Sequence, residues 1–331
     1  MVPSDKRVVA YATAAVFSAA GLAFALSHRY LRTHESSAAP DPELAVPDDV
    51  VHREIAMRDG GEIHLIERGE GPPLMLLHGA SLSSEAWSYQ LRDLAPNHRV
   101  IALDLRGHGL STAGHEGVTI SAMADDVDEV LIALDLSDVV LAGHSMGGMV
   151  CLRLARHHPE LVGTRIGAIA LIGTSGGLGV PVPSWGRLSA AVSRVAGAGV
   201  GIWRPARTAL PTGDTGYLAS RIGFGRRARP VEVVETLRML RATEPEVFTG
   251  LVGEVLAFEE REEFGGVEVP VVVAVGTSDH LTPPLYARRL VAGFENATLV
   301  EYEGAGHMLM YERRAEISDL LDKLSARVSS S

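Results

Sequence analysis

Residues 139–157 read VVLAGHSMGGMVCLRLARH, an apolar strand-like run that leads through a glycine-rich turn into a helix-like segment. Gly143, Ser145 and Gly147 in this turn form a G-x-S-x-G pattern, which is typical of a nucleophile elbow when a strand precedes it and a helix follows it. The sharp turn exposes the serine hydroxyl, and the glycines leave room where strand and helix cross. The helix N-terminus adds partial positive charge beside that hydroxyl. We therefore predict that Ser145 is a catalytic nucleophile.

An acid and a histidine follow the serine along the chain, each just past the end of a predicted strand. Residues 269–275 form a nearly continuous β-branched run that ends shortly before Asp279. Residues 297–302 form another short strand, and His307 lies on the loop after it. Ligands bind outside the carboxyl ends of the strands of an open parallel sheet, so we expect Ser145 and these two side chains to meet there. In such a triad the imidazole takes the serine proton, and the carboxylate fixes the imidazole tautomer.

Two backbone N–H groups are expected to complete the site as an oxyanion hole. Residues 73–77 indicate a buried strand, and the sequence HGAS follows it. The N–H of Met146, directly after the nucleophile, is one expected donor. The N–H of Ala80 is the other, with Ser81 left open as an alternative, and His78 is expected to shape the loop without transferring a proton. Two such donors are worth roughly 3 kcal/mol each in this kind of chemistry.

These motifs resemble those of the α/β-hydrolase superfamily, and most of all its esterase, haloperoxidase and C–C hydrolase branch. Members of this branch share H-G near the first buried strand, here His78-Gly79, and D-x-R-G-x-G-x-S after the next strand, here residues 104–111. Trp87 matches a tryptophan that family members often carry several residues after H-G. The resemblance covers about residues 51–327. In the epoxide hydrolase and haloalkane dehalogenase branches of the superfamily the nucleophile is an aspartate, so Ser145 argues against both, although the fold hosts many reactions.

Strand-like and helix-like runs alternate along the rest of the core, which predicts crossover connections and a mainly parallel sheet flanked by helices. The strand-like runs are 99–103, 139–142 and 166–172, and the helix-like runs are 120–134 and 149–157. Residues 53–57 and 62–68 flank Asp59-Gly60-Gly61 and predict an antiparallel hairpin at the sheet edge. Asp104 and Arg106 are expected to be structural, through a salt bridge that fixes the loop.

The chain divides into a core, an insertion and an N-terminal extension. The core is expected at residues 50–173 and 259–331. Residues 174–258 break the alternation, with glycine and proline clusters and helix-like pieces at 184–196 and 230–243. In the family that the motifs resemble, an insertion at this place is a lid. We therefore expect a helical cap that supplies much of the acyl pocket.

The cap is rich in arginine and has no lysine, although the formal net charge of the whole chain is −11. A basic cap on an acidic body indicates contact with an anionic group, such as lipid headgroups or a substrate carboxylate. A solvated arginine surface is the alternative. The arginines are Arg187, Arg194, Arg204, Arg207, Arg221, Arg226, Arg227, Arg229, Arg238 and Arg241.

The N-terminus begins with an apolar segment. Residues 8–26 carry no charged side chain, and their number is close to the roughly 20 residues of a bilayer-spanning helix. We predict that residues 1–32 anchor the chain in a membrane, in an orientation that the flanking basic residues leave open. A cleaved signal peptide, which would make the protein secreted, and a soluble amphipathic extension are the alternatives. Residues 33–49, with three prolines, are expected to be a flexible tether.

The sequence thus predicts a membrane-tethered serine hydrolase with Ser145, Asp279 and His307 as its triad. The expected substrate is a small or medium apolar carboxylic ester, or a glycerolipid. A C–C bond hydrolase of ring-cleavage products, which uses the same triad, is the first alternative. A non-catalytic ligand-binding protein on the same fold is the second.

This chemistry needs no cofactor and no metal. The single cysteine, Cys151, cannot form an internal disulfide and is expected to be a small buried residue. We expect a membrane surface as a partner and no nucleic acid. The oligomeric state is left open.

Overall fold

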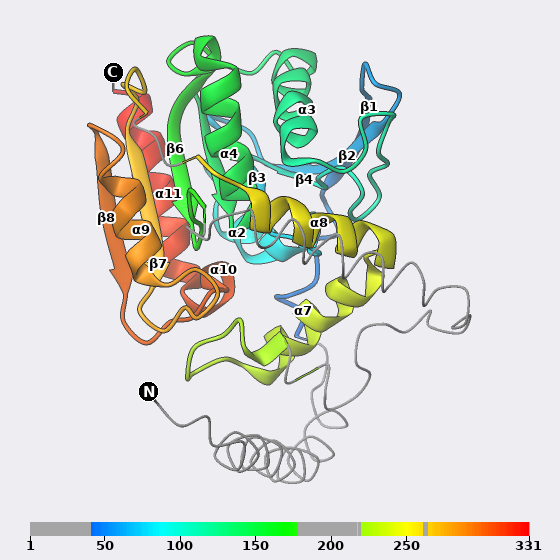
Figure 1. Ribbon diagram of the computed structural model, residues 1–331, viewed down its shortest axis with the longest axis vertical. Helices are drawn as coiled ribbons and strands as arrows, with labels where there is room; N and C mark the ends of the chain where they lie inside the picture. Colours follow the sequence, from blue (N-terminus) through cyan, green and yellow to red (C-terminus); the bar gives the residue numbers. More distant parts are fainter. Residues whose placement is uncertain (1–40, 178–216, 218–219, 261–263, 331) are drawn as a thin grey trace, which may run out of the picture.

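One sheet of eight strands organises the computed structural model, which describes residues 41–177, 217, 220–260 and 264–330 (Figure 1). Its strand order is β1-β2-β4-β3-β5-β6-β7-β8. The β1–β2 and β2–β4 pairs are antiparallel and all other pairs are parallel, as the sequence predicted. The strands are β1 (Val51–Ala56), β2 (Glu62–Arg68), β3 (Pro73–Leu77), β4 (Arg99–Leu103), β5 (Val139–His144), β6 (Ile166–Ile172), β7 (Val271–Gly276) and β8 (Ala297–Tyr302).

Helices cover both faces of the sheet. On one face pack α3 (Ile120–Ala133), α4 (Met146–His157) and α9 (Pro284–Val291), and on the other α2 (Ser88–Asp93), α10 (Leu309–Glu312) and α11 (Arg314–Val328). Short 3₁₀ turns lie at η1 (Ser84–Trp87) and η2 (Pro159–Leu161). In β3, Met75 and Leu77 belong to the first core and Leu74 and Leu76 to the second. Successive strand side chains point to opposite faces, so a strand buried on both faces is a continuous apolar run.

The helix after β5 begins earlier than the sequence indicated. α4 starts at Met146, three residues before the predicted segment 149–157, because the helix follows the elbow directly. The predicted strand bounds at 73–77, 99–103, 166–172 and 297–302 are confirmed. Cys151 is buried in the core, as expected.

Two cap helices, α7 (Pro230–Ala242) and α8 (Pro245–Ala257), lie beyond one end of the sheet (Figure 1). Glu254 of α8 accepts a hydrogen bond from the N–H of Ile120, the first residue of α3, at 3.1 Å. The prediction of a helix at 230–243 is confirmed, whereas the sequence did not single out α8. The predicted helix at 184–196 falls outside the described residues.

The segment 41–50, which precedes β1, is bound along the core. Arg92 donates hydrogen bonds to three of its carbonyl oxygens, and Arg68 pairs with Asp49 at 2.8 Å. Leu44 is only 6% exposed and packs into the second core. Over residues 41–49 the structure thus differs from the flexible tether expected at 33–49, and residues 33–40 of that prediction fall outside the described residues.

Two further arginines explain that difference. Arg229, at the start of the cap helix α7, pairs with Asp41, and Arg314 pairs with Glu43 at 2.7 Å. Acidic side chains and carbonyl oxygens of residues 41–49 therefore meet arginines from the core and the cap. Arg229 is one of the cap arginines that the sequence analysis assigned to a basic surface, and in the structure it pairs with Asp41.

The predicted anchor over residues 1–32 lies outside the described residues and stays a prediction. Within the part of the chain that the structure describes, no helix has the length and apolar composition needed to cross a bilayer.

Candidate active site

Ser145 occupies a strained turn between β5 and α4. Its φ of 51° and ψ of −116° lie in a region that residues other than glycine rarely adopt. A Cβ added at Gly147 would lie 2.4 Å from the Leu77 carbonyl oxygen, and one at Gly143 would lie 2.3 Å from the Gly147 oxygen. Neither glycine can carry a side chain without a shift of the backbone. The turn therefore has the geometry that the G-x-S-x-G pattern predicts.

The backbone of Ser145 is fixed to the end of β6. Its N–H donates to the Ile172 carbonyl at 2.9 Å, and the Thr174 hydroxyl donates to the Ser145 carbonyl at 2.7 Å. The side chain of Ser145 is partly exposed, whereas its neighbours His144 and Met146 are buried. Ser145 is thus a partly exposed residue between two buried neighbours.

Asp279 and His307 form a buried pair on the loops after β7 and β8. The Asp279 Oδ2 and His307 Nδ1 atoms are 2.8 Å apart. Burial alone would raise the pKa of Asp279, but hydrogen bonds from His307 and Thr282 hold it below its ordinary value. The carboxylate is therefore ionised at neutral pH and can only accept, so Nδ1 of His307 carries the proton. This leaves Nε2 as the basic nitrogen of the ring.

Thr282 holds this pair together, and the sequence analysis missed it. Its hydroxyl donates to Asp279 Oδ2 at 2.8 Å and lies 3.2 Å from His307 Nδ1. The N–H groups of Leu281 and Thr282 both donate to Asp279 Oδ1 at 2.8 Å. An aspartate that binds backbone N–H groups two and three residues on is a common turn arrangement. The spacing from Asp279 to Thr282 was the signal in the sequence.

The loop of His307 lies against the elbow through His144, the residue before the nucleophile. The two imidazole rings have centroids 4.8 Å apart, and His144 Nε2 is 3.0 Å from the His307 carbonyl oxygen. Burial, with His307 nearby, lowers the pKa of His144 to about 3, so its ring is neutral and donates from Nε2. The loop that carries His307 is thus held against the residue that precedes Ser145.

The loop after β3 also reaches the elbow. A Cβ added at Gly79 would lie 3.1 Å from the Ser145 Cβ. Among the residues that the structure describes, neither the Ala80 N–H nor the Met146 N–H has a hydrogen-bond partner. The Ser81 N–H donates to His108 Nε2 at 3.1 Å. Of the two donors left open on this loop, Ala80 is therefore the one whose N–H is unused.

His78 shapes this loop. Its Nδ1 lies 2.7 Å from the Gly79 carbonyl oxygen, and its Nε2 accepts from the Leu105 N–H at 2.9 Å. Burial lowers the pKa of His78 to about 3. Both ring nitrogens are therefore occupied and the ring stays neutral, as a structural role requires.

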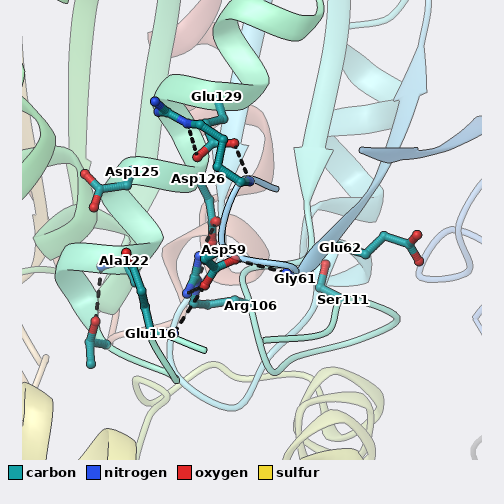
Figure 2. A network of polar contacts seen from close by, with 12 residues as sticks. Asp59, Gly61, Glu62, Arg106, Ser111, Glu116, Ala122, Asp125, Asp126 and Glu129 are labelled. Atoms are coloured by element: carbon teal, nitrogen blue, oxygen red, sulfur yellow. Dashed lines mark hydrogen bonds and ion pairs between the residues drawn. The ribbon is translucent and has the colours of Figure 1, made fainter. Parts of the chain in front are cut away.

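Asp104 and Arg106 are structural, but they do not pair with one another. Arg106 lies between Asp126 of α3 and Asp59 of the β1–β2 turn, with its Nη1 2.9 Å from the Asp59 carboxylate (Figure 2). Asp104 instead accepts from the N–H groups of Ser84 and Leu110 and from His64. The loop is thus fixed by two separate networks, one around each side chain, instead of one salt bridge.

Comparisons with known proteins identify the family of this chain. Residues 72–314 match the family model of the alpha/beta hydrolase fold, so the chain belongs to this family. It is similar to the AB hydrolase superfamily protein YisY of Bacillus subtilis (strain 168), with 28% identity over 280 residues, which cover 78% of this chain and 92% of that protein. The non-heme chloroperoxidase CPO-A1 of Kitasatospora aureofaciens is 42% identical over 102 residues, 30% of this chain and 37% of that protein.

A solved structure of an esterase is also similar to this chain. The esterase RhEst1 from Rhodococcus sp. ECU1013 has 25% sequence identity and a TM-score of 0.67, covering 84% of this chain and 99% of that one. The expected superfamily and its α/β-hydrolase core are therefore confirmed. The coarse class that follows is a hydrolase of this family, with esterases among its structural relatives.

Proposed function

We propose that this protein is a serine hydrolase that cleaves a carboxylic ester through an acyl-enzyme. The observation that carries the proposal is the buried Asp279–His307 pair, 2.8 Å apart, on loops that converge at the strained Ser145 turn. Nucleophile, base and orienting acid in this arrangement are the parts that acyl transfer needs. The esterase relative supports the same class of reaction.

In the first half of the reaction the Ser145 oxygen attacks the acyl carbonyl carbon, and its proton passes to Nε2 of His307. The negative charge moves to the carbonyl oxygen, where the N–H groups of Ala80 and Met146 would receive it. The positive charge on the imidazole is balanced by Asp279. When the ester C–O bond breaks, His307 returns the proton to the leaving alcohol.

In the second half water takes the place of the alcohol. His307 removes one proton from the water as its oxygen attacks the acyl-enzyme carbonyl, and then returns that proton to the Ser145 oxygen. The acid is released and the enzyme is restored. No metal or organic cofactor takes part in either half.

For the substrate we propose a small or medium apolar ester, or a glycerolipid. An assay of the purified protein against 4-nitrophenyl esters, a dispersed glycerolipid and ring-cleavage dienones tests this. Ester turnover is expected, and Ser145→Ala should lower it by roughly 10⁶-fold with the fold retained. Ser137→Ala, the same change in the exposed turn before β5, is the matched control and should leave turnover unchanged. Turnover of dienones alone would favour the C–C hydrolase, and turnover of none would favour a binding protein.

We also propose that the N-terminal segment anchors the protein in a membrane. The uncharged run at residues 8–26 supports this proposal. Full-length protein should then sediment with membranes and resist extraction with carbonate, because a spanning helix is held by apolar burial. Full-length, unprocessed protein in the soluble fraction would contradict the anchor, and a mature N-terminus near Leu26 would establish a cleaved signal peptide.

A further inference from the structure

The cap segment 221–225 lies against the loop that carries His307. The N–H of His307 donates to the Gly223 carbonyl at 2.8 Å. Gly225 and Gly306 come so close that a Cβ added at Gly225 would lie 2.7 Å from the Gly306 nitrogen. The loop of His307 is thus in contact with the cap segment as well as with the core.

One carboxylate spans this junction. Glu312 Oε2 accepts the Gly225 N–H at 2.7 Å, and Glu312 Oε1 accepts the Gly306 N–H at 2.9 Å. Glu312 ends α10 on the core, and Gly306 directly precedes His307. Each carboxylate oxygen therefore holds one side of the junction.

We propose that Glu312 is a positioning residue, which sets the place of the His307 loop by bridging it to the cap segment 221–225. The inference rests on the proposed function, in which His307 is the general base. A general base must lie within hydrogen-bond reach of the proton that it takes, and a misplacement of about 1 Å can cost about 100-fold in rate. Turnover then depends on how the cap segment is docked, although that segment supplies no triad residue.

The charges around Glu312 make this bridge sensitive to acid. Burial raises its pKa above the ordinary value, although the N–H groups of Gly225 and Gly306 favour the ionised form. Glu232 of α7 raises the pKa further, and Arg221 of the cap segment lowers it. Protonation of Glu312 would replace one acceptor oxygen by an O–H group. This O–H group would face an N–H donor, so one of the two hydrogen bonds of the bridge would be lost.

The first variant, Glu312→Gln, keeps one acceptor oxygen but turns an NH₂ group toward the second N–H. On a water-soluble 4-nitrophenyl ester near pH 8, we expect kcat to fall about tenfold, the scale of one hydrogen bond to a charged group. KM should stay within about twofold, because the loss concerns the reacting groups. Glu316→Gln, which removes the same charge on an exposed position of α11, is the matched control and should keep kcat.

A second variant tests the bridge from the cap side and does not depend on Glu312 itself. Gly225→Ala places a Cβ 2.3 Å from the Gly304 carbonyl oxygen and 2.7 Å from Glu312 Oε2, so the junction must open. Its kcat should fall at least as far as that of Glu312→Gln. Gly253→Ala, in α8, adds the same methyl group where nothing lies within 4 Å and should leave kcat unchanged.

The pH profile separates positioning from a general loss of stability. The ratio of wild-type kcat to Glu312→Gln kcat should decline toward one as the pH falls, because the wild-type carboxylate then protonates as well. A ratio that does not change with pH, or an unchanged kcat in both Glu312→Gln and Gly225→Ala, would overturn the inference alone. Wild-type protein without esterase activity would overturn the proposed function and this inference together.

Discussion

Two buried aspartate–histidine pairs lie beside the sheet in the described part of the chain, and their carboxylate-to-ring contacts are alike. Asp279 and His307 are 2.8 Å apart after β7 and β8, and Asp104 and His64 are 2.8 Å apart between β4 and β2. All four side chains are at most 7% exposed. In both pairs backbone N–H groups also bind the carboxylate.

The pairs differ in what the second ring nitrogen of the histidine faces. His64 Nε2 lies 2.9 Å from His52 Nδ1, and these two rings line a cavity of about 520 Å³ between the segment before β1, the hairpin and α7. His307 instead lies on a loop that packs on the elbow of Ser145. On the proposed function, an aspartate–histidine pair is therefore not a catalytic site by itself. The proposal rests on the strained turn of Ser145, against which the loop of His307 packs through His144.

The largest expected effect is a loss of kcat when the carboxylate of the Asp279–His307 pair is replaced. Asp279→Asn should lower kcat by about 10³–10⁴-fold, because an amide no longer selects the tautomer of His307 that leaves Nε2 basic. Steady-state kinetics on a soluble ester, with melting as the check on folding, measures this. Activity within a few-fold of wild type at unchanged melting would place the orienting acid elsewhere, and Glu303 would be the next residue to test.

The same substitution at the other pair should act on stability. Asp104→Asn turns an NH₂ group toward donors from Ser84, Leu110 or His64, and we expect a loss of about 2–4 kcal/mol in the free energy of unfolding. Its kcat should stay within about threefold of wild type once the protein is folded. Urea unfolding and ester kinetics on the same preparation test both statements. A large loss of kcat without loss of stability would give the Asp104 pair a catalytic role.

Acid unfolding sharpens the comparison. Burial would raise the pKa of Asp104, but hydrogen bonds from His64 and from backbone N–H groups bring it down to about 2. A carboxyl whose pKa is lower in the folded state stabilises the fold fully above its unfolded pKa and loses that contribution as the pH falls through the folded value. The wild type should thus lose roughly 2 kcal/mol between about pH 5 and pH 2 from this group. Asp104→Asn should lack this component, and an identical pH dependence in both proteins would contradict the assignment.

The smallest expected effect concerns Thr282. Thr282→Val keeps the shape of the side chain and removes the hydroxyl that binds Asp279, so kcat should fall about tenfold. Thr282→Ser retains the hydroxyl and should restore most of the rate. Equal kcat in the valine and serine variants would show that the backbone N–H groups alone orient the carboxylate.

Much of the sheet, and the positions of Ser145, Asp279 and His307 just past the ends of their strands, could be predicted because they depend on local patterns. Strands buried on both faces are continuous apolar runs, which is why β3, β4 and β6 were placed with their bounds. The elbow and the two later strand-end residues follow from the order of motifs along the chain. Helix α8 escaped prediction because Gly250 and Gly253 interrupt its pattern and both are weak helix formers.

The remaining features depend on contacts between distant parts of the chain. Ala80 and Ser81 could not be told apart until the Ser81 N–H was seen to bind His108. The partners of Arg106 lie 47 and 20 residues away in the sequence, so no spacing rule indicates them. The bound segment before β1 likewise depends on arginines from four separate elements.

The most direct test of the account is the site of covalent labelling by a fluorophosphonate. Intact wild-type protein is treated with the probe, digested, and the labelled peptide is identified by mass spectrometry. The account predicts a single adduct on Ser145, strongly slowed labelling in Asp279→Asn, and wild-type labelling in Asp104→Asn. An adduct on another residue, or equal labelling of Ser145→Ala, would contradict it.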